Sequence, residues 1–129
     1  GVFNSTGAFP DVEAQYLALT QELSELGLLY LHLLDHSAMG APPVPAEFKL
    51  HVREAFKGLF ILAGGFDRAG AERALKASQA DLIAFARPFL ANPDLVKRMQ
   101  TDAPLNTVDM ATFYTPGSKG YTDYPALAA

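Results

Sequence analysis

The chain has 129 residues, enough for one domain, and half of them are hydrophobic. Its formal net charge of −4 argues against a nucleic-acid binder, because a protein that binds a phosphate backbone needs a clustered basic surface. It has no cysteine, which excludes disulfides, thiolate catalysis and zinc–sulfur sites. No apolar run approaches the roughly 20 residues of a membrane span, and the N-terminus lacks a basic-then-apolar signal pattern, so we expect no membrane association and a cytoplasmic location.

The first part of the chain predicts a helix, a strand and a second helix. Apolar periodicity predicts a helix from Val12 to about Leu26, with Asp11 as its N-cap and Gly27 as its C-cap glycine. The apolar stripe expected to face inward consists of Tyr16, Leu19, Leu23 and Leu26. The run from Leu28 to Leu34 is nearly all apolar, as is typical of a strand buried on both faces of a parallel sheet. After a loop rich in Gly and Pro, a helix is predicted over about 46–56.

Two strand ends of similar design follow. Residues 59–67, LFILAGGFD, predict a buried strand that ends in two glycines, and a helix over about 67–78 comes next. Residues 81–88, DLIAFARP, repeat the design with Arg87 where the strand ends. The two stretches therefore predict neighbouring strands with similar carboxyl ends.

The C-terminal part predicts one more helix and a tail. Asn92 is the expected N-cap, because a proline follows it in the first turn. Leu95, Val96 and Met99 are expected to pack inward. Residues 101–129 contain several Pro and Gly residues, so we expect them to form an irregular tail.

The alternation of strands and helices predicts an α/β fold with parallel strands joined by right-handed crossovers. Three such strands suit a small doubly wound sheet or part of a (β/α)8 barrel, which typically needs about 250 residues. A piece of a barrel leaves strand edges and inward-facing side chains in water. We therefore expect a companion polypeptide, a homo-oligomer, or a parent protein from which the piece was separated.

The two strand ends also predict a phosphate site. Gly64 and Gly65 have no side chain to block a ligand, and free N–H groups at a helix N-terminus attract anions. Ala86 is small, and Arg87 offers a planar fork of donors that suits phosphate. Asp67 would repel an anion, so we interpret it as a helix cap. On the pattern alone, an ordinary turn and a surface arginine explain these residues equally well.

Other polar residues have weaker functional signals. His32, among leucines in a strand, is expected to be a core histidine; His36 could contact a substrate or nicotinamide; His51 is expected to face solvent. Their spacing is not that of metal ligands. Asp81 is expected to be a cap or part of an ion pair, whereas Asp35, at a strand's carboxyl end, is a weak functional candidate.

At these motifs the chain resembles the C-terminal part of the old yellow enzyme family, the FMN-dependent ene-reductases built on a (β/α)8 TIM barrel. The matching stretches are Gly27 to Asp35, AGGFDR (63–68), ADLIAFARPFLANPDL (80–95), APLN (103–106) and TFYTPGSKGYTDYP (112–125). The resemblance implies that residues 1–129 are the C-terminal segment of a single FMN-binding domain, with strands six to eight of the barrel and their helices.

The resemblance also implies roles for individual residues. Gly64, Gly65, Ala86 and Arg87 would bind the FMN phosphate, and Tyr114 would lie near the flavin and the substrate pocket. Ala86 departs from the family's usual glycine. No catalytic residue is assigned here, because the family's proton donor and substrate-anchoring pair belong to the first five strands.

The implied function is that of an ene-reductase segment. NAD(P)H would reduce FMN, and the flavin would pass a hydride to an activated alkene, a small-molecule substrate. The chain alone would be inactive without a companion N-terminal polypeptide. The alternative is a non-catalytic phosphate-binding or assembly module, which functions by association as a partial barrel.

Overall fold

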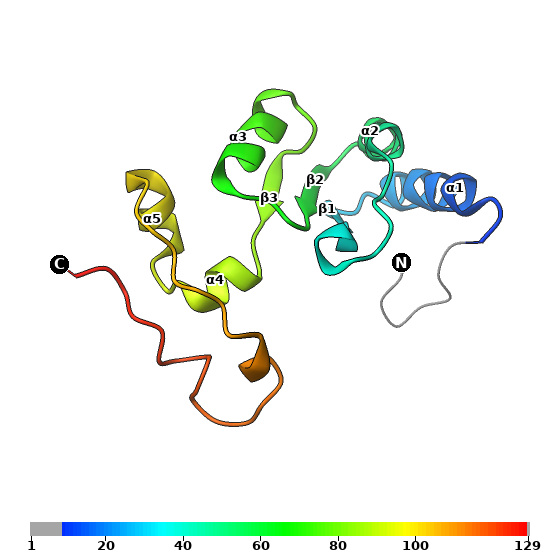
Figure 1. The fold of residues 1–129 in the computed structure, drawn as a ribbon. Coiled ribbons are helices and arrows are strands. Elements are labelled where there is room, and N and C mark those ends of the chain that lie inside the picture. Colours follow the sequence, from blue (N-terminus) through cyan, green and yellow to red (C-terminus); the bar gives the residue numbers. More distant parts are fainter. Residues whose placement is uncertain (1–8, 129) are drawn as a thin grey trace. The chain divides into compact units, whose positions relative to one another are not determined.

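The computed structural model describes residues 9–128, and the chain divides after Ala84 into two compact units (Figure 1). The first unit contains α1 (Val12–Glu25), β1 (Tyr30–Leu34), the 3-10 turn η1 (His36–Met39), α2 (Ala46–Ala55), β2 (Leu59–Ala63), α3 (Arg68–Lys76) and β3 (Leu82–Ala84). The second contains α4 (Arg87–Ala91), α5 (Leu95–Thr101) and the 3-10 turn η2 (Met110–Thr112). Within residues 9–128, each helix is too short or too polar to cross a lipid bilayer.

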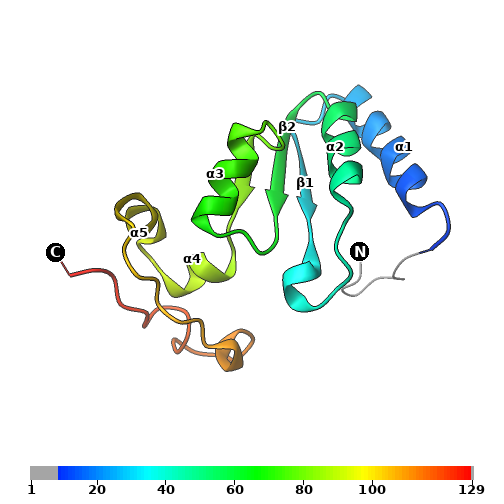
Figure 2. The ribbon, with the colours of Figure 1, turned by 45° about the horizontal axis from the view of Figure 1, so that its top comes forward.

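The three strands form one parallel sheet in the order β1-β2-β3, as the alternation of elements predicts. In the register, Leu34 pairs with Ala63, and Ala63 pairs with Ala84. The carboxyl ends of all three strands therefore meet at one edge of the sheet. Figure 2 shows β1 and β2 side by side and pointing the same way, with α2 and α3 along them.

The core of the first unit lies on the face of the sheet that the helices cover. Phe60 is fully buried and Leu62 is 4% exposed, and both pack with Val52 of α2 and with Ala80. Side chains of a strand alternate between faces, so the residues between them point the other way. One face of the sheet thus supplies most of the apolar burial in this unit.

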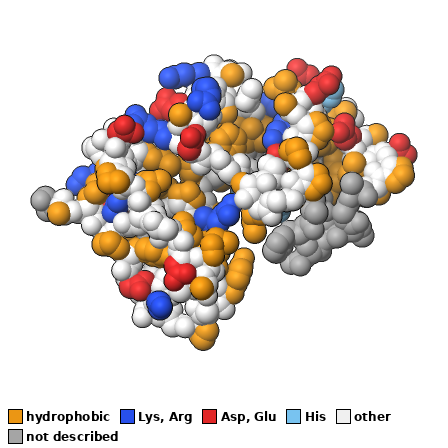
Figure 3. Space-filling model, in the orientation of Figure 1, with side chains coloured by type: hydrophobic (Ala, Val, Ile, Leu, Met, Phe, Trp, Pro, Cys, Tyr) orange, Lys and Arg blue, Asp and Glu red, His pale blue; other side chains and the backbone are white. Residues whose placement is uncertain are grey.

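The opposite face of the sheet is apolar but open. Tyr30, Leu34, Leu59 and Leu82 each remain 45–54% exposed. Within residues 9–128 one face of these strands is therefore uncovered, as expected of a piece of a barrel whose inward-facing side chains remain in water. His32 lies on the same open face and is exposed, so it is not a core histidine within these residues. Hydrophobic side chains are visible over much of the surface in Figure 3.

Helix α1 begins at the predicted residue, ends one residue early and is followed by Gly27 in the left-handed conformation, but its apolar stripe is not buried. Asp11 occupies the N-cap position without a capping hydrogen bond from its side chain. The helix packs against α2, while Tyr16, Leu19 and Leu26 are 43%, 49% and 75% exposed. Leu23 is half-buried, and Thr20 is the residue of this helix that is buried. The stripe stays in water because no described element packs on that side of α1.

The second unit differs from the prediction at its helix start. The N-cap of α5 is Asp94 rather than Asn92, and a short helix, α4, precedes it. Asn92 is buried instead: its Nδ2 donates to the Pro88 carbonyl at 2.8 Å, and its Oδ1 accepts from the Asn106 N–H at 2.7 Å. Val96 is 58% exposed, so its expected inward position is wrong as well.

The tail is irregular apart from η2, but side chains tie it to α5. The Arg98 guanidinium, 5% exposed, donates to Asp94 Oδ1 (2.7 Å) and to the carbonyls of Pro104 (2.5 Å) and Pro125 (2.9 Å). Asp94 Oδ2 accepts the Leu127 N–H at 2.8 Å. This N–H and Arg98 hold the pKa of the Asp94 carboxyl below its usual range. The tail thus depends on buried charge-assisted hydrogen bonds more than on secondary structure.

Candidate functional site

The turn after β2 has the left-handed backbone that glycine favours. The φ angles of Gly64 and Gly65 are 113° and 69°. A Cβ at Gly64 would lie 1.9 Å from the carbonyl oxygen of Asp35, and one at Gly65 would lie 2.8 Å from the Cβ of Ala38. Both positions therefore require glycine because the loop after β1 approaches them closely. A ligand at this turn would need the same free space.

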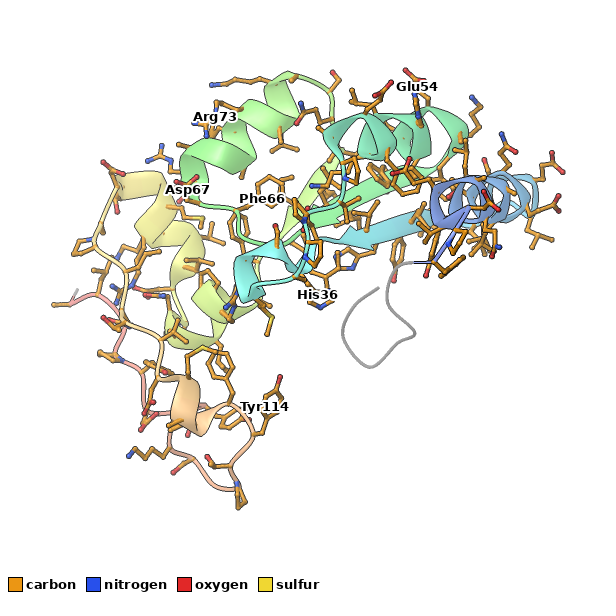
Figure 4. The ribbon with its side chains drawn as sticks, turned by 45° about the vertical axis from the view of Figure 1, so that its right-hand side comes forward. His36, Glu54, Phe66, Asp67, Arg73 and Tyr114 are labelled. Atoms are coloured by element: carbon orange, nitrogen blue, oxygen red, sulfur yellow. The ribbon has the colours of Figure 1, made fainter. Side chains whose placement is uncertain are left out.

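The N–H groups of this turn are available to a ligand. Within residues 9–128, the N–H groups of Gly64 and Gly65 donate no hydrogen bond, and Gly65 is exposed. Asp67 caps α3 by accepting the Gly70 N–H at 2.6 Å, which confirms its interpretation as a helix cap. Figure 4 shows Phe66 and Asp67 where the chain passes from β2 into α3.

The second half of the predicted site begins just after β3. Gly64 follows the end of β2 directly, and Ala86 and Arg87 follow the end of β3 after one intervening residue. Ala86 has φ −100°, a value open to any residue, so an alanine is accommodated where the family usually has glycine. Arg87 is half-buried, and its guanidinium has no carboxylate partner in the described part of the chain. The assignment of these four residues to one phosphate site stays a prediction.

The loop after β1 contains a buried carboxylate that sequence reasoning ranked low. Asp35, 5% exposed, accepts hydrogen bonds from the Ser37 N–H (2.9 Å), the Val44 N–H (3.3 Å) and Lys49 Nζ (2.5 Å). Burial raises the pKa of this carboxyl, but the hydrogen bonds from Lys49 and Ser37 outweigh burial and bring it below its usual value. The position of Asp35 directly after a strand was the only sequence signal, and Lys49 carried none.

Asp81 forms a similar cluster at the other end of the sheet. It accepts the Phe60 N–H at 2.7 Å and the guanidinium of Arg53 at 2.9 Å. This arrangement confirms the prediction that Asp81 belongs to an ion pair. Lys49 and Arg53 are four residues apart and so share one side of α2, which is thereby tied to two strand ends.

The histidines and Tyr114 lie in different places. His36 begins η1 and is half-buried (Figure 4). His51 is exposed, as expected. Tyr114, in the tail, is 90% exposed and meets the Phe113 ring edge to face at 6.3 Å. Its place at a substrate pocket stays a prediction. Among residues 9–128, no group of His, Asp or Glu side chains is suited to hold a metal ion.

A small cavity of about 230 Å³ lies within the first unit. It is lined by Ala46, Lys49, Leu50, Leu62, Ala63, Phe66 and Gln79. The only cation in this lining, Lys49, is already paired with Asp35. The cavity is therefore not suited to a phosphate group.

Comparisons with known proteins agree with the motifs. The sequence profile of the NADH:flavin oxidoreductase / NADH oxidase family matches residues 6–106. The chain is 45% identical over 118 residues to 12-oxophytodienoate reductase 2 of Arabidopsis thaliana, covering 89% of this chain and 32% of that one. A 12-oxophytodienoate reductase-like protein of Solanum lycopersicum is 44% identical over 117 residues, which cover 89% of this chain and 31% of that one.

Solved structures show the same relationship. Morphinone reductase in complex with tetrahydroNAD superposes with a TM-score of 0.84 at 40% identity, covering 94% of this chain and 32% of that one. The chain thus spans about a third of the length of the relatives it matches, and its three parallel strands are part of a TIM barrel of their kind. The chain belongs to the NADH:flavin oxidoreductase / NADH oxidase family, the old yellow enzymes.

Proposed function

We propose that this chain supplies the FMN phosphate site of an NAD(P)H-dependent oxidoreductase that reduces activated C=C bonds. The observation that carries the proposal is the Gly64–Gly65 turn, whose N–H groups donate no hydrogen bond within residues 9–128. Family membership supports FMN as the cofactor, and the reductase names of the relatives support the reaction class. The morphinone reductase complex with tetrahydroNAD supports a nicotinamide as the reductant.

The residues at the two strand ends fit a phosphate group. The N–H groups of two successive glycines with positive φ donate no hydrogen bond within residues 9–128, and no Cβ stands beside them, which supports an anion site at this turn. In the register Ala63 pairs with Ala84, the last residues of β2 and β3, and this pairing supports the proposal that the residues following each strand act on one phosphate. An arginine without a carboxylate partner is suited to neutralise the phosphate charge.

The role of this chain is to bind and orient the cofactor. FMN, when bound, supplies the hydride-transfer chemistry. Gly64, Gly65, Ala86 and Arg87 would hold its phosphate and so fix its position relative to the barrel. Tyr114, with its exposed ring, would border the substrate. No residue of this chain is given a proton-transfer step.

We further propose that the chain acts with a partner that completes the barrel. The open sheet face formed by Tyr30, Leu34, Leu59 and Leu82 is apolar, and β1 has a free edge within the described residues. A companion N-terminal polypeptide would cover both, and a homo-oligomer is the other option. The isolated chain would be inactive, and a cytoplasmic location stays a prediction.

The test replaces Arg87 with Ala in the complete flavoprotein. The charge-assisted hydrogen bond to phosphate is worth about 1.5–3 kcal/mol, so Arg87→Ala should weaken FMN binding by about tenfold or more. Riboflavin, which lacks the phosphate, should bind the variant and the unchanged protein equally. Arg73→Ala, which removes an exposed arginine from α3, is the matched control and should change neither affinity. Equal FMN affinity in the Arg87 variant would refute the phosphate assignment.

The alternative function, a non-catalytic phosphate-binding or assembly module, is favoured by the same open apolar face. A native mass spectrum of the purified protein separates the two. A complex that carries the mass of FMN and a second polypeptide supports the reductase. A flavin-free homo-oligomer supports the assembly module.

A further inference from the structure

The buried Asp35 carboxylate lies against the glycine turn. Its backbone N–H donates to the Ala63 carbonyl at 2.9 Å, which extends the β1–β2 ladder by one residue. Its own carbonyl is the group that a Cβ at Gly64 would meet at 1.9 Å. Three residues later, in η1, the Cβ of Ala38 lies 2.8 Å from the Cβ position of Gly65. Residues 35–38 thus form one wall of the turn.

The side chain of Asp35 holds this wall in place. One carboxylate oxygen accepts the Ser37 N–H and caps η1, and the other accepts the Val44 N–H and Lys49 Nζ. These donors come from the start of the loop, from its end and from α2. The loop from 35 to 44 is therefore held by hydrogen bonds to a single carboxylate. This carboxylate is buried, since Asp35 is 5% exposed.

We infer that Asp35, paired with Lys49, is a positioning residue that sets the backbone of the Gly64–Gly65 turn for phosphate binding. This inference rests on the proposed function. The positive φ angles of Gly64 and Gly65 are accessible because glycine has little steric restriction, so the turn needs contacts from the neighbouring loop to keep a single conformation. A binding site held by supporting hydrogen bonds loses affinity when those bonds are removed, commonly by 10–100-fold in metal sites. Asp35 would therefore influence FMN without touching it.

The test compares Asp35→Asn with Asp81→Asn in the complete flavoprotein. Asn at 35 keeps one acceptor for the Ser37 N–H, but its NH2 group faces the donors Val44 N–H and Lys49 Nζ. Asp81 is the control, because it also accepts hydrogen bonds from the backbone and from a cation of α2, but it is exposed and lies at the opposite end of the strands. Lys49→Met provides a second variant, which removes the partner and leaves the Asp35 carboxylate in place.

Two measurements are made on each variant: FMN and riboflavin affinity by titration, and the hydrogen-exchange protection of the residue 35 amide, which donates to the Ala63 carbonyl just before the turn. Asp35→Asn and Lys49→Met should weaken FMN about tenfold, leave riboflavin within about twofold, and lower the protection of this amide. Asp81→Asn should change neither the FMN-to-riboflavin preference nor this protection.

The outcomes separate the inference from the proposed function. If the unchanged protein binds FMN no better than riboflavin, the phosphate site is wrong, and the protection of the residue 35 amide still tests whether the Asp35 side chain holds the loop against the turn. If Asp35→Asn weakens both flavins equally, or if Asp81→Asn has the same effect, Asp35 is a stabilising residue only and the inference is overturned. Unchanged protection of this amide in both the Asp35 and Lys49 variants also overturns it.

Discussion

Replacing Gly64 with alanine tests how closely the loop after β1 approaches the turn. The new Cβ would lie 1.9 Å from the Asp35 carbonyl oxygen and 2.8 Å from its carbon, both backbone atoms that a rotamer change cannot move. The residue also has φ 113°, which costs an L-residue about 1–2 kcal/mol. Overpacking adds about 1–3 kcal/mol, so we expect Gly64→Ala to destabilise the protein by about 2–5 kcal/mol.

Gly40 is the matched control, because it has φ 86° but nothing within 4 Å of its Cβ position. Gly40→Ala should therefore cost only the backbone strain, about 1–2 kcal/mol. Urea unfolding followed by circular dichroism measures both, with the slope m checked for constancy. If both variants lose the same free energy of unfolding, the close approach of Asp35 to Gly64 contributes nothing to the cost of Gly64→Ala.

Three further outcomes are expected. Phe60→Ala removes a fully buried side chain and should lower the free energy of unfolding by about 3–5 kcal/mol in the same urea assay. A loss below about 1 kcal/mol would contradict the placement of Phe60 in the core. The pKa of Asp35 lies below its ordinary value of 3.8, so its contribution to stability is complete above that pH and is lost as the pH falls through the lowered pKa. The stability difference between the unchanged protein and Asp35→Asn should therefore shrink as the pH falls below about 4. Arg98→Met removes the donors to the Pro104 and Pro125 carbonyls, and limited proteolysis should then cut the tail faster than α1–β3; an unchanged cleavage pattern would show that the tail is held by other contacts.

Several features were predictable because their causes are local. The apolar run before Gly64 and Gly65 predicts β2, and Asp67 followed by a helical stretch predicts its cap. Strands separated by helices predict parallel pairing, which the register of β1, β2 and β3 shows. The cap of α5 was predicted wrongly at Asn92, because its amide bonds with Asn106, fourteen residues on, and no short pattern reveals such a partner.

The sequence by itself determined the order of the elements, the glycine turn, and the family through its long motifs. Only the tertiary structure decided which face of the sheet the helices cover, so that Phe60 is buried while Leu59 and His32 are exposed. The tertiary structure also forms the ion pair between Asp35 and Lys49 and brings the Asp35 carbonyl close to Gly64. The physical reason is range: propensity, capping and periodicity act within a few residues, whereas burial and ion pairing depend on residues that only the folded chain brings together.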